Sequence, residues 1–245
     1  MTMIKTAHPQ KIIYPESDGK PMGETDAHIT ALIYLMNALR DHFRDNPQVY
    51  VAGNMFLYYE EGDPAAVVAP DVFVVKGVTK YKRRTYKMWE EKQAPAVIFE
   101  LTSRSTRLDD LGSKRVVYEM LGVQEYYLFD PYGEYLEPRL WAYQLERNDD
   151  GYSEYLRIMG NTVYSPALDL NLFPDGDLLR LQTPKTGEKL LSDLEAQAAR
   201  RAEAEARRAE TEARRAETEA RRAAEAEAAH LRAELARLQA ALDKK

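Results

Sequence analysis

The sequence predicts an α/β domain over residues 1–190, followed by one long C-terminal helix over residues 191–245. Two observations carry this prediction. Residues 96–129 have the pattern of a strand, a helix and a second strand, which is typical of a crossover connection within one sheet. Beyond Leu190 there is no proline, glycine, phenylalanine, tyrosine or tryptophan, so the composition changes from that of a packed domain to that of a solvated helix.

The first part of the domain is predicted to hold one helix and several short strands. Residues 1–23 are rich in proline and polar residues and are expected to be an irregular arm. Glu24-Thr25-Asp26 opens a helix that should reach about Phe43. Its predicted apolar face consists of Ile29, Leu32, Ile33, Met36, Leu39 and Phe43. Strands are predicted at 49–51 and 55–59, and the apolar stretch 65–75 is interrupted by Asp71 directly after Pro70.

Residues 76–92 form a basic segment, with seven lysines and arginines among Tyr81, Tyr86 and Trp89. Basic side chains interleaved with aromatic ones suit contact with a nucleic-acid backbone. A solvated loop or a short helix would have the same composition, so both interpretations stay open.

The central crossover carries a charge where a buried strand usually has none. Residues 96–99 are an apolar run typical of a central strand, and the run ends in Glu100. A helix is predicted from Asp109 to Leu121, with one side formed by Leu111, Val117, Tyr118 and Leu121. Lys114 lies on or beside this apolar side, where a merely solvating lysine is not expected. A strand from Glu125 to Phe129 completes the crossover.

The last part of the chain is predicted to be strands and then one helix. A strand pair is expected at 139–145 and 152–157, and a closing strand segment at 164–181. The helix that follows should run to Leu242. Its alanines at 206, 209, 213, 216 and 220 have the spacing of a coiled-coil seam, which Leu231, Leu235 and Leu238 continue after a change of phase. Alanines bury little, so we expect weak self-association, with a solitary helix held by pairs such as Glu203 and Arg207 as the alternative.

The composition limits the class of protein. The absence of cysteine excludes disulfides, thiolate nucleophiles and cysteine-bound zinc, and it agrees with a cytoplasmic location. No apolar run approaches ~18 residues and no signal sequence begins the chain, so neither membrane spanning nor secretion is expected. The net charge of -6 lies in residues 1–190, because residues 191–245 carry 12 basic and 12 acidic side chains. An acidic body argues against unspecific DNA binding by global charge but leaves room for a local basic patch.

Asp71 and Glu100 are the residues whose positions indicate chemistry. Two carboxylates on adjacent strands can hold Mg²⁺, which keeps several waters and binds a substrate phosphate. Such an ion lowers the pKa of a bound water, and a nearby lysine stabilises the charge that develops on the phosphate. Without an ion the two buried carboxylates would repel each other. The alternative is that Asp71 is a turn residue and that Glu100 pairs with Arg104 or Lys114.

Six short motifs lie at and around these residues. They are YPESDGKPM at 14–22 with Glu24 and His28, Pro70-Asp71, RRTYK at 83–87, ELTSRST at 100–106, DLGSK at 110–114, and GVQEY at 122–126 with FDP at 129–131. Together they resemble the Uma-type family of restriction endonucleases, in the PD-(D/E)XK nuclease superfamily, over about Tyr14 to Leu191. The resemblance implies a restriction-endonuclease-like core, which is a mixed central sheet flanked by helices.

The resemblance also implies roles for individual residues. Asp71 and Glu100 become metal ligands and catalytic residues, with the Leu101 carbonyl as a third ligand. The superfamily lysine stands two residues after the acidic ligand, and here that position is Thr102. In some members the lysine lies on the following helix, so Lys114 is the expected replacement, with Arg104 or no substitute as alternatives. Glu24 is a further candidate ligand or a plain cap residue, and His28 is expected to be a packing or hydrogen-bonding residue.

The sequence therefore predicts a Mg²⁺-dependent (or Mn²⁺-dependent) endonuclease that hydrolyses DNA phosphodiester bonds with a metal-activated water. A homodimer is expected, formed through the nuclease domain, the coiled coil or both, since paired subunits suit the cutting of two strands. One alternative is a catalytically inactive nuclease fold that serves as a nucleic-acid-binding or coiled-coil assembly module. Another is a nuclease that acts on RNA or branched DNA.

Overall fold

The computed structural model describes residues 12–17, 19 and 23–242. Most of the arm predicted at residues 1–23 lies outside these residues. The chain divides into two compact units, Met1–Ser192 and Asp193–Lys245. The second unit is the helix α5, Asp193–Leu242.

The first unit is built on a six-stranded sheet in the order β1-β4-β6-β7-β8-β9. β6 and β7 are parallel, whereas every other neighbouring pair is antiparallel. The prediction of an α/β fold with a mixed central sheet is therefore confirmed. The strands are β1 (Val49–Ala52), β4 (Val72–Lys76), β6 (Val97–Leu101), β7 (Glu125–Phe129), β8 (Leu140–Arg147) and β9 (Ser153–Ile158).

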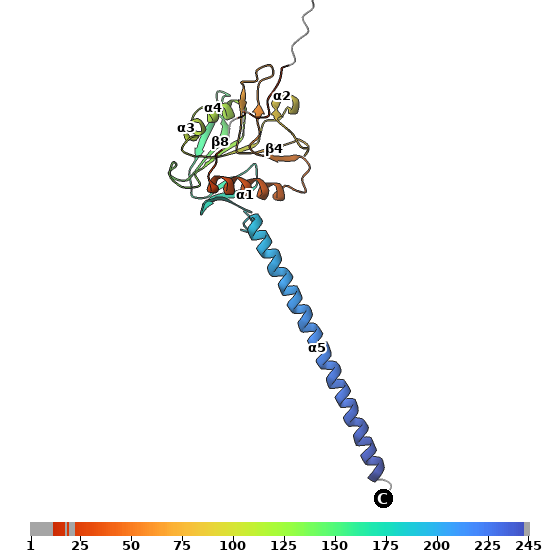
Figure 1. The fold of residues 1–245 in the computed structure, drawn as a ribbon. Helices are drawn as coiled ribbons and strands as arrows, with labels where there is room; N and C mark the ends of the chain where they lie inside the picture. Colours follow the sequence, from red (N-terminus) through yellow and green to blue (C-terminus); the bar gives the residue numbers. More distant parts are fainter. Residues whose placement is uncertain (1–11, 18, 20–22, 243–245) are drawn as a thin grey trace, which may run out of the picture. The chain divides into compact units, whose positions relative to one another are not determined.

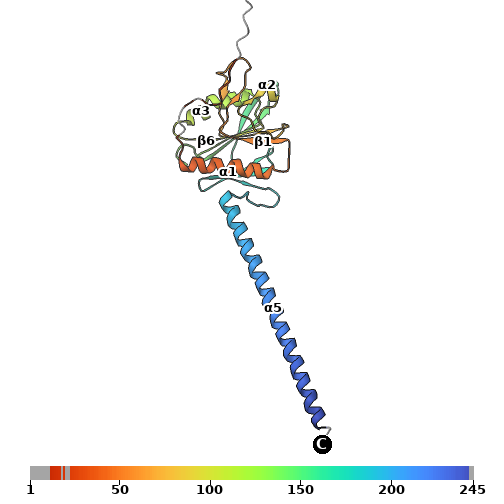
Figure 2. The same cartoon turned by 45° about the vertical axis from the view of Figure 1, so that its right-hand side comes forward.

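Each face of this sheet is covered by other elements (Figures 1 and 2). Helix α1 (Asp26–His42) packs on one face, together with a sheet of β10 (Val163–Ser165), β11 (Leu170–Asp175) and β12 (Leu178–Gln182). The other face packs against α4 (Ser113–Met120) and a small sheet of β3 (Val67–Val68), β2 (Leu57–Tyr58) and β5 (Tyr86–Lys87). Because side chains alternate along a strand, Phe99 lies in the first core and Ile98 in the second.

Helix α1 begins at the predicted place, but its buried face differs from the prediction. Thr25 is its N-cap, and the Thr25 hydroxyl accepts a hydrogen bond from the His28 amide. Ile29 and Ile33 were expected to face the core, yet they are 43% and 46% exposed. The buried residues of α1 are Ala27, His28, Ala31, Leu32, Tyr34, Leu35, Ala38 and Leu39, of which only Leu32 and Leu39 belong to the predicted face. Alanine lets the helix approach the sheet closely. A prediction that chose the buried side of α1 by the size of its apolar side chains was therefore wrong for Ile29 and Ile33.

The crossover between β6 and β7 contains two short helices, so the prediction of one helix over 109–121 is wrong. They are α3 (Arg107–Leu111) and α4 (Ser113–Met120). Gly112 separates them with φ -110° and ψ -96°. A Cβ at this position would lie 2.9 Å from the Leu108 carbonyl oxygen. The close approach explains why glycine occupies the break.

The basic segment 76–92 folds into β5 and the short helix α2 (Met88–Glu91), with loops around them. Several of its cations are used within the protein. Arg83 forms an ion pair with Glu91 at 2.7 Å, Arg84 pairs with Glu16, and Lys87 lies 2.9 Å from Glu90. Lys80 donates to the Phe43 and Arg44 carbonyls after the end of α1. These contacts favour the structural interpretation of this segment over the nucleic-acid one.

The helix α5 is one continuous element of 50 residues. Pairing of this helix with a second copy stays a prediction. Among the helices of the described residues, none combines the length and the apolar character that crossing a bilayer requires.

Candidate functional site

Asp71 and Glu100 meet where β4 begins and β6 ends. The antiparallel register pairs Val72 with Phe99, and one further step along it brings Asp71 opposite Glu100. The Leu101 amide donates a hydrogen bond of 2.7 Å to Asp71 Oδ2 and so fixes this carboxylate. Glu100 is only 1% exposed. The sequence prediction that these two acids are neighbours is thus matched by the geometry.

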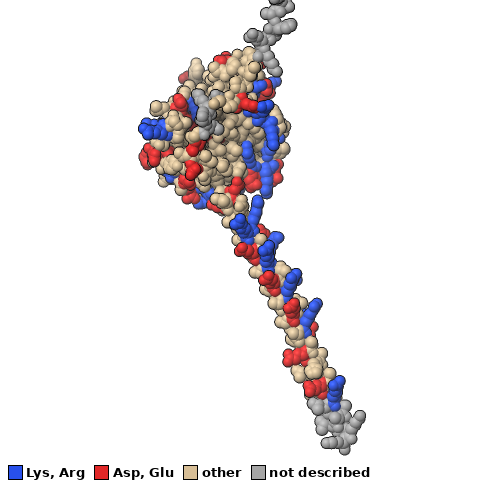
Figure 3. Space-filling model, viewed as in Figure 1, with Lys and Arg blue, Asp and Glu red and all other residues tan. Residues whose placement is uncertain are grey.

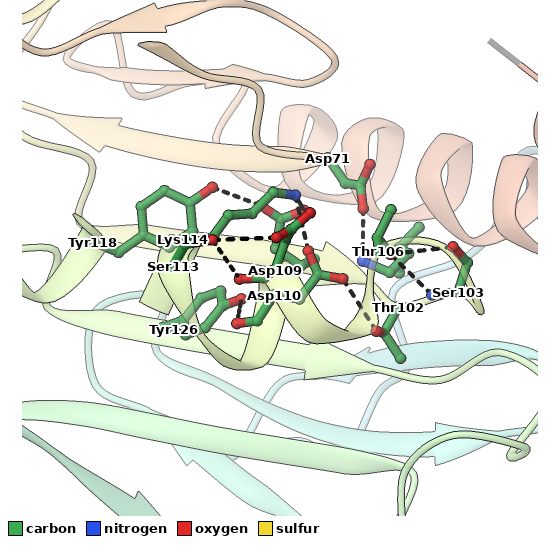
Figure 4. A network of polar contacts seen from close by, with 12 residues as sticks. Asp71, Thr102, Ser103, Thr106, Asp109, Asp110, Ser113, Lys114, Tyr118 and Tyr126 are labelled. Atoms are coloured by element: carbon green, nitrogen blue, oxygen red, sulfur yellow. Dashed lines mark hydrogen bonds and ion pairs between the residues drawn. The ribbon is translucent and has the colours of Figure 1, made fainter. Parts of the chain in front are cut away.

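Lys114 reaches the same place from α4. Its Nζ lies 3.0 Å from Glu100 Oε2 and 2.9 Å from Asp110 Oδ1. Tyr118, one helical turn further on, donates a hydrogen bond of 2.6 Å to Glu100 Oε1. Figure 4 shows Lys114, Tyr118 and Asp110 converging from the α3–α4 segment. The pairing of Glu100 with Lys114, an alternative left open by the sequence, is therefore present.

Asp110 is a member of this site that the sequence prediction missed. It is fully buried, and the Thr102 hydroxyl donates to its Oδ2 at 3.1 Å. The Tyr126 hydroxyl donates to its backbone carbonyl at 2.8 Å. The available signal was the spacing of Asp110, Lys114 and Tyr118, which lie four residues apart, as residues on successive turns of one helix do. Gly112 separates α3 from α4, but Asp110 Oδ1 and Lys114 Nζ still lie 2.9 Å apart.

The site has more carboxylates than cations. Asp71, Glu100 and Asp110 act on one another and on the single ammonium group of Lys114. Burial raises the pKa of Glu100 well above 4.5, and Asp71 and Asp110 raise it further against the opposing effect of Lys114. Burial also raises the pKa of Asp110. For Lys114 burial favours the neutral amine, but Glu100 and Asp110 outweigh it and raise the pKa, so the ammonium form persists at neutral pH.

His28 connects the site to α1. Its Nδ1 lies 3.4 Å from Glu24 Oε2, and its Nε2 lies 3.5 Å from Asp71 Oδ1. Burial lowers the pKa of His28, but the carboxylates of Asp71 and Glu24 raise it above 6.5 overall. Glu24 is thus tied to Asp71 through the imidazole. The burial of His28 agrees with the expectation, but its two ring nitrogens lie at ion-pair distances from these carboxylates and not in hydrogen bonds.

A cleft of about 600 Å³ opens beside these residues. It is lined by residues 23–25 and His28, by residues 102–105, and by residues 131–135 except Gly133. Arg104 lines the cleft and is exposed. The loop after β7 is held by Asp130, whose buried carboxylate accepts hydrogen bonds from the amides of Tyr132, Gly133, Tyr135 and Leu136. One wall of the cleft is therefore rigidly anchored.

Comparison with known proteins gives one family. The model of the family described as "Uma2: Putative restriction endonuclease" matches residues 7–172. The chain belongs to this Uma2 family. No curated protein matches the chain.

Among solved structures, this Uma2 chain is similar to a putative nuclease belonging to DUF820 from Anabaena variabilis. The two are 15% identical, with a TM-score of 0.43, and the similarity covers 62% of this chain and 81% of the other.

Within this Uma2 domain, the predicted site residues fall into two groups. Lys114 contacts Glu100 directly, Asp71 lies opposite Glu100 and acts on it electrostatically, and Glu24 joins Asp71 through His28. The amide of Leu101 contacts Asp71, whereas a metal-ligand role for the Leu101 carbonyl stays a prediction. Arg104 forms no ion pair with Glu100 within the part of the chain that the structure describes.

Proposed function

We propose that the protein is a metal-dependent endonuclease that hydrolyses DNA phosphodiester bonds in the cytoplasm. Membership of the Uma2 family supports nuclease-like function. The observation that carries the proposal is the meeting of Asp71 and Glu100 at neighbouring strand ends, with the Lys114 ammonium on Glu100. Paired acids with an adjacent cation are the groups that hydrolysis of an anionic phosphodiester needs.

The residues of the site fit a hard divalent cation. Glu100 and Asp110 contact the Lys114 ammonium and Asp71 acts on it from nearby, so the carboxyl groups outnumber the lysine, and a bound cation would favour their ionised forms. Within the described residues no three acidic or histidine side chains are already arranged as a metal site. Mg²⁺ needs only one or two carboxylates because it keeps several of its waters. Asp71 and Glu100 would hold Mg²⁺ or Mn²⁺, with Glu24 and the Leu101 carbonyl as further candidate ligands.

The bound ion would supply Lewis-acid charge at the phosphate and a water of lowered pKa. The protein's own side chains contribute the rest. Lys114 acts as a fixed positive charge and not as a base, because its pKa is raised by Glu100 and Asp110. Placed beside the reacting phosphate, it stabilises the negative charge of the transition state. Ser103 and Ser105 offer hydroxyl groups along the cleft, and Arg104 offers a guanidinium group, which are the groups that usually contact a nucleic-acid backbone.

The proposal is tested by cleavage of plasmid DNA with Mg²⁺ or Mn²⁺. The native chain is compared with Asp71→Ala and Glu100→Ala, and with Asp45→Ala as a matched control, since the Asp45 side chain is 97% exposed. We expect cleavage by the native chain and the control and loss of at least about 100-fold in both site variants. Cleavage unchanged in Asp71→Ala and Glu100→Ala would contradict the site assignment.

Metal binding is measured separately by thermal unfolding. At an ion concentration about 100 times Kd, binding to the folded state adds roughly 2.7 kcal/mol of stability. Mn²⁺ should therefore raise the Tm of the native chain and of Asp45→Ala but leave that of Glu100→Ala unchanged. An equal rise in all three would mean that the ion binds elsewhere.

One observation favours a second function. Thr102 stands where the superfamily lysine would be, and the Lys114 ammonium is occupied by Glu100 and Asp110. A chain that binds nucleic acid without cutting it would agree with this arrangement. DNA binding without cleavage under either metal would support this module over the enzyme.

A further inference from the structure

Helix α5 sorts its side chains by type around its axis. From residue 199 to 223 the seven-residue repeat places alanine at the two seam positions, a and d, in every heptad. The e and g positions beside the seam hold glutamates from Glu203 to Glu219. The b and c positions hold only arginine, in the pairs Arg200-Arg201, Arg207-Arg208, Arg214-Arg215 and Arg221-Arg222. We call these eight residues the arginine stripe.

The stripe is a continuous cationic surface. At about 100° per residue, the two arginines of a pair lie roughly 100° apart and the f position lies between them. Ala204, Thr211 and Thr218 fill that position and carry no charge. The stripe lies opposite the alanine seam and extends for about 33 Å along the helix at 1.5 Å per residue. Figure 3 shows blue side chains following one side of the helix and red side chains another.

Most of the stripe is available to an external anion. All eight arginines are exposed. Arg207 lies 3.2 Å from Glu203 and Arg221 lies 2.9 Å from Glu225, both as exposed pairs. Over the described part of α5, no other arginine of the stripe has an acid within 4.0 Å. Exposed pairs of this kind contribute little and exchange readily for another partner.

The chemistry of the stripe identifies the class of anion. Guanidinium groups bind phosphate oxygens in a bidentate manner. The arginine stripe and the f positions within it hold only arginine, threonine and alanine, with no large apolar side chain that could insert into a bilayer. Duplex DNA carries one negative charge per about 1.7 Å of axis, so a straight row of about 33 Å can contact several phosphates. If two helices pair through their seams, the stripes of both still face outwards.

We infer that the arginine stripe of α5 binds the sugar–phosphate backbone of nucleic acid. The inference rests on the proposed function in one respect only, which is that the bound nucleic acid is the substrate of the nuclease domain. The stripe would provide a cationic surface for a polyanion in a chain whose residues 1–190 carry the whole net charge of -6. The tail is neutral in sum, so its binding depends on the segregation of charge and not on its total.

The test uses a full-length variant with the same composition and a broken stripe. Arginine and glutamate exchange places in three heptads: Arg201→Glu with Glu203→Arg, Arg208→Glu with Glu210→Arg, and Arg215→Glu with Glu217→Arg. A second variant replaces all eight arginines by lysine, which keeps the charge. Circular dichroism establishes that the helix content of both is unchanged.

Binding to a duplex of about 20 base pairs is measured by fluorescence anisotropy in EDTA over a series of salt concentrations. We expect the variant with exchanged charges to bind the duplex at least about tenfold more weakly. The negative slope of log K against log salt should become shallower by about 0.9 for each phosphate contact removed. The lysine variant should retain the native slope. Native affinity and slope in the exchanged variant would overturn the inference.

Two further outcomes separate the alternatives. Stronger binding to phosphatidylserine vesicles or to polyglutamate than to the duplex would overturn nucleic acid as the partner. Since the binding assay contains no metal, it is independent of catalysis. A chain that cleaves DNA but binds it equally well with a broken stripe refutes this inference alone, whereas stripe-dependent binding without cleavage refutes the enzyme alone.

Discussion

Lys114 is held by two carboxylates, and one of them is itself held by Thr102. The contacts run from Thr102 Oγ1 to Asp110 Oδ2 at 3.1 Å, from Asp110 Oδ1 to Lys114 Nζ at 2.9 Å, and from Lys114 Nζ to Glu100 Oε2 at 3.0 Å. Thr102, where the family resemblance leads one to expect a lysine, therefore helps to orient Lys114 of α4. A lysine substituted at position 102 would extend from the end of β6, the strand that carries Glu100.

We therefore predict that Lys114→Met lowers cleavage by at least about 100-fold, as loss of a charge-stabilising group does. Adding Thr102→Lys to Lys114→Met should restore part of the activity, because a new ammonium reaches the same carboxylates. The measurement is the rate of plasmid nicking at saturating Mg²⁺. If Lys114→Met cuts at the native rate, the lysine has no catalytic role.

Thr102→Val should destabilise the fold. Valine has nearly the shape of threonine, but it leaves the buried Asp110 carboxylate without this donor. An unsatisfied buried group costs about 1–3 kcal/mol, and urea unfolding measures it. Thr102→Ser is the matched control, since it keeps the hydroxyl. Equal stability of Thr102→Val and the native chain would show that the hydrogen bond contributes nothing.

The Arg83–Glu91 ion pair predicts a pH dependence of stability. Arg83 donates to both carboxylate oxygens at 2.7 and 2.9 Å, and the two side chains are 2% and 13% exposed. Arg83 lowers the pKa of Glu91 below 4.5. The folded state therefore binds the proton less readily than the unfolded chain. The stabilisation is present above the unfolded pKa and is lost as the pH falls through the lower folded value.

Glu91→Gln should accordingly reduce the free energy of unfolding by about 2 kcal/mol at neutral pH. The difference from the native chain should shrink towards zero below about pH 4. Glu90→Gln, at a side chain 57% exposed, should change stability by less than about 0.5 kcal/mol. A difference for Glu91→Gln that is independent of pH would contradict the assignment of the effect to this ion pair.

At the scale of elements, Gly53 is the residue after β1, and it lies against the backbone that leads into β4. The amide of the next residue, Asn54, donates to the Pro70 and Asp71 carbonyls, each at 3.1 Å. A Cβ on Gly53 would lie 2.3 Å from the Asp71 carbonyl oxygen and 2.6 Å from Met36 Sδ. Gly53 therefore permits the close approach of β1, α1 and the segment that carries Asp71.

We predict that Gly53→Ala costs about 1–3 kcal/mol of stability and lowers cleavage, because Asp71 must move. Chemical unfolding and plasmid cleavage measure the two effects. Gly23→Ala is the control for stability, since a Cβ at that position has no atom within 4 Å. A free energy of unfolding equal to that of the native chain would mean that the neighbouring atoms can move aside and that the close approach does not require glycine.

The elements also explain what the sequence could predict. Periodicity located α1, the crossover and α5, because these patterns are local. It misjudged the buried side of α1, where alanines rather than Ile29 and Ile33 face the sheet. It also missed the break at Gly112, which depends on a contact with the Leu108 carbonyl. Asp110 escaped notice because its role depends on Thr102, the residue after β6, which only the folded chain brings near.

At the scale of the whole molecule, the two units differ in how charge is distributed. Residues 1–190 carry 22 basic and 28 acidic side chains, whereas the tail carries 12 of each. In the tail the charges are segregated, with glutamates at the e and g positions on both sides of the alanine seam. In a parallel pair of identical helices the e position of one lies beside the g position of the other. Self-association along the seam therefore brings glutamates together and is opposed.

The homodimer predicted from the sequence should thus depend on the leucines that follow the alanines of the seam, of which Leu231 and Leu235 are 51% and 59% exposed. We predict that the full chain shows a concentration-dependent monomer–dimer equilibrium in sedimentation velocity. Truncation after Leu190, or Leu231→Ser with Leu235→Ser, should leave a monomer at every concentration. Replacing Glu205, Glu212 and Glu219 by glutamine should strengthen dimerisation by removing like charges, each pair contributing a few tenths of a kcal/mol. Equal monomeric masses for the full chain and the truncation would rule out pairing through α5, and α5 would then be a solitary helix.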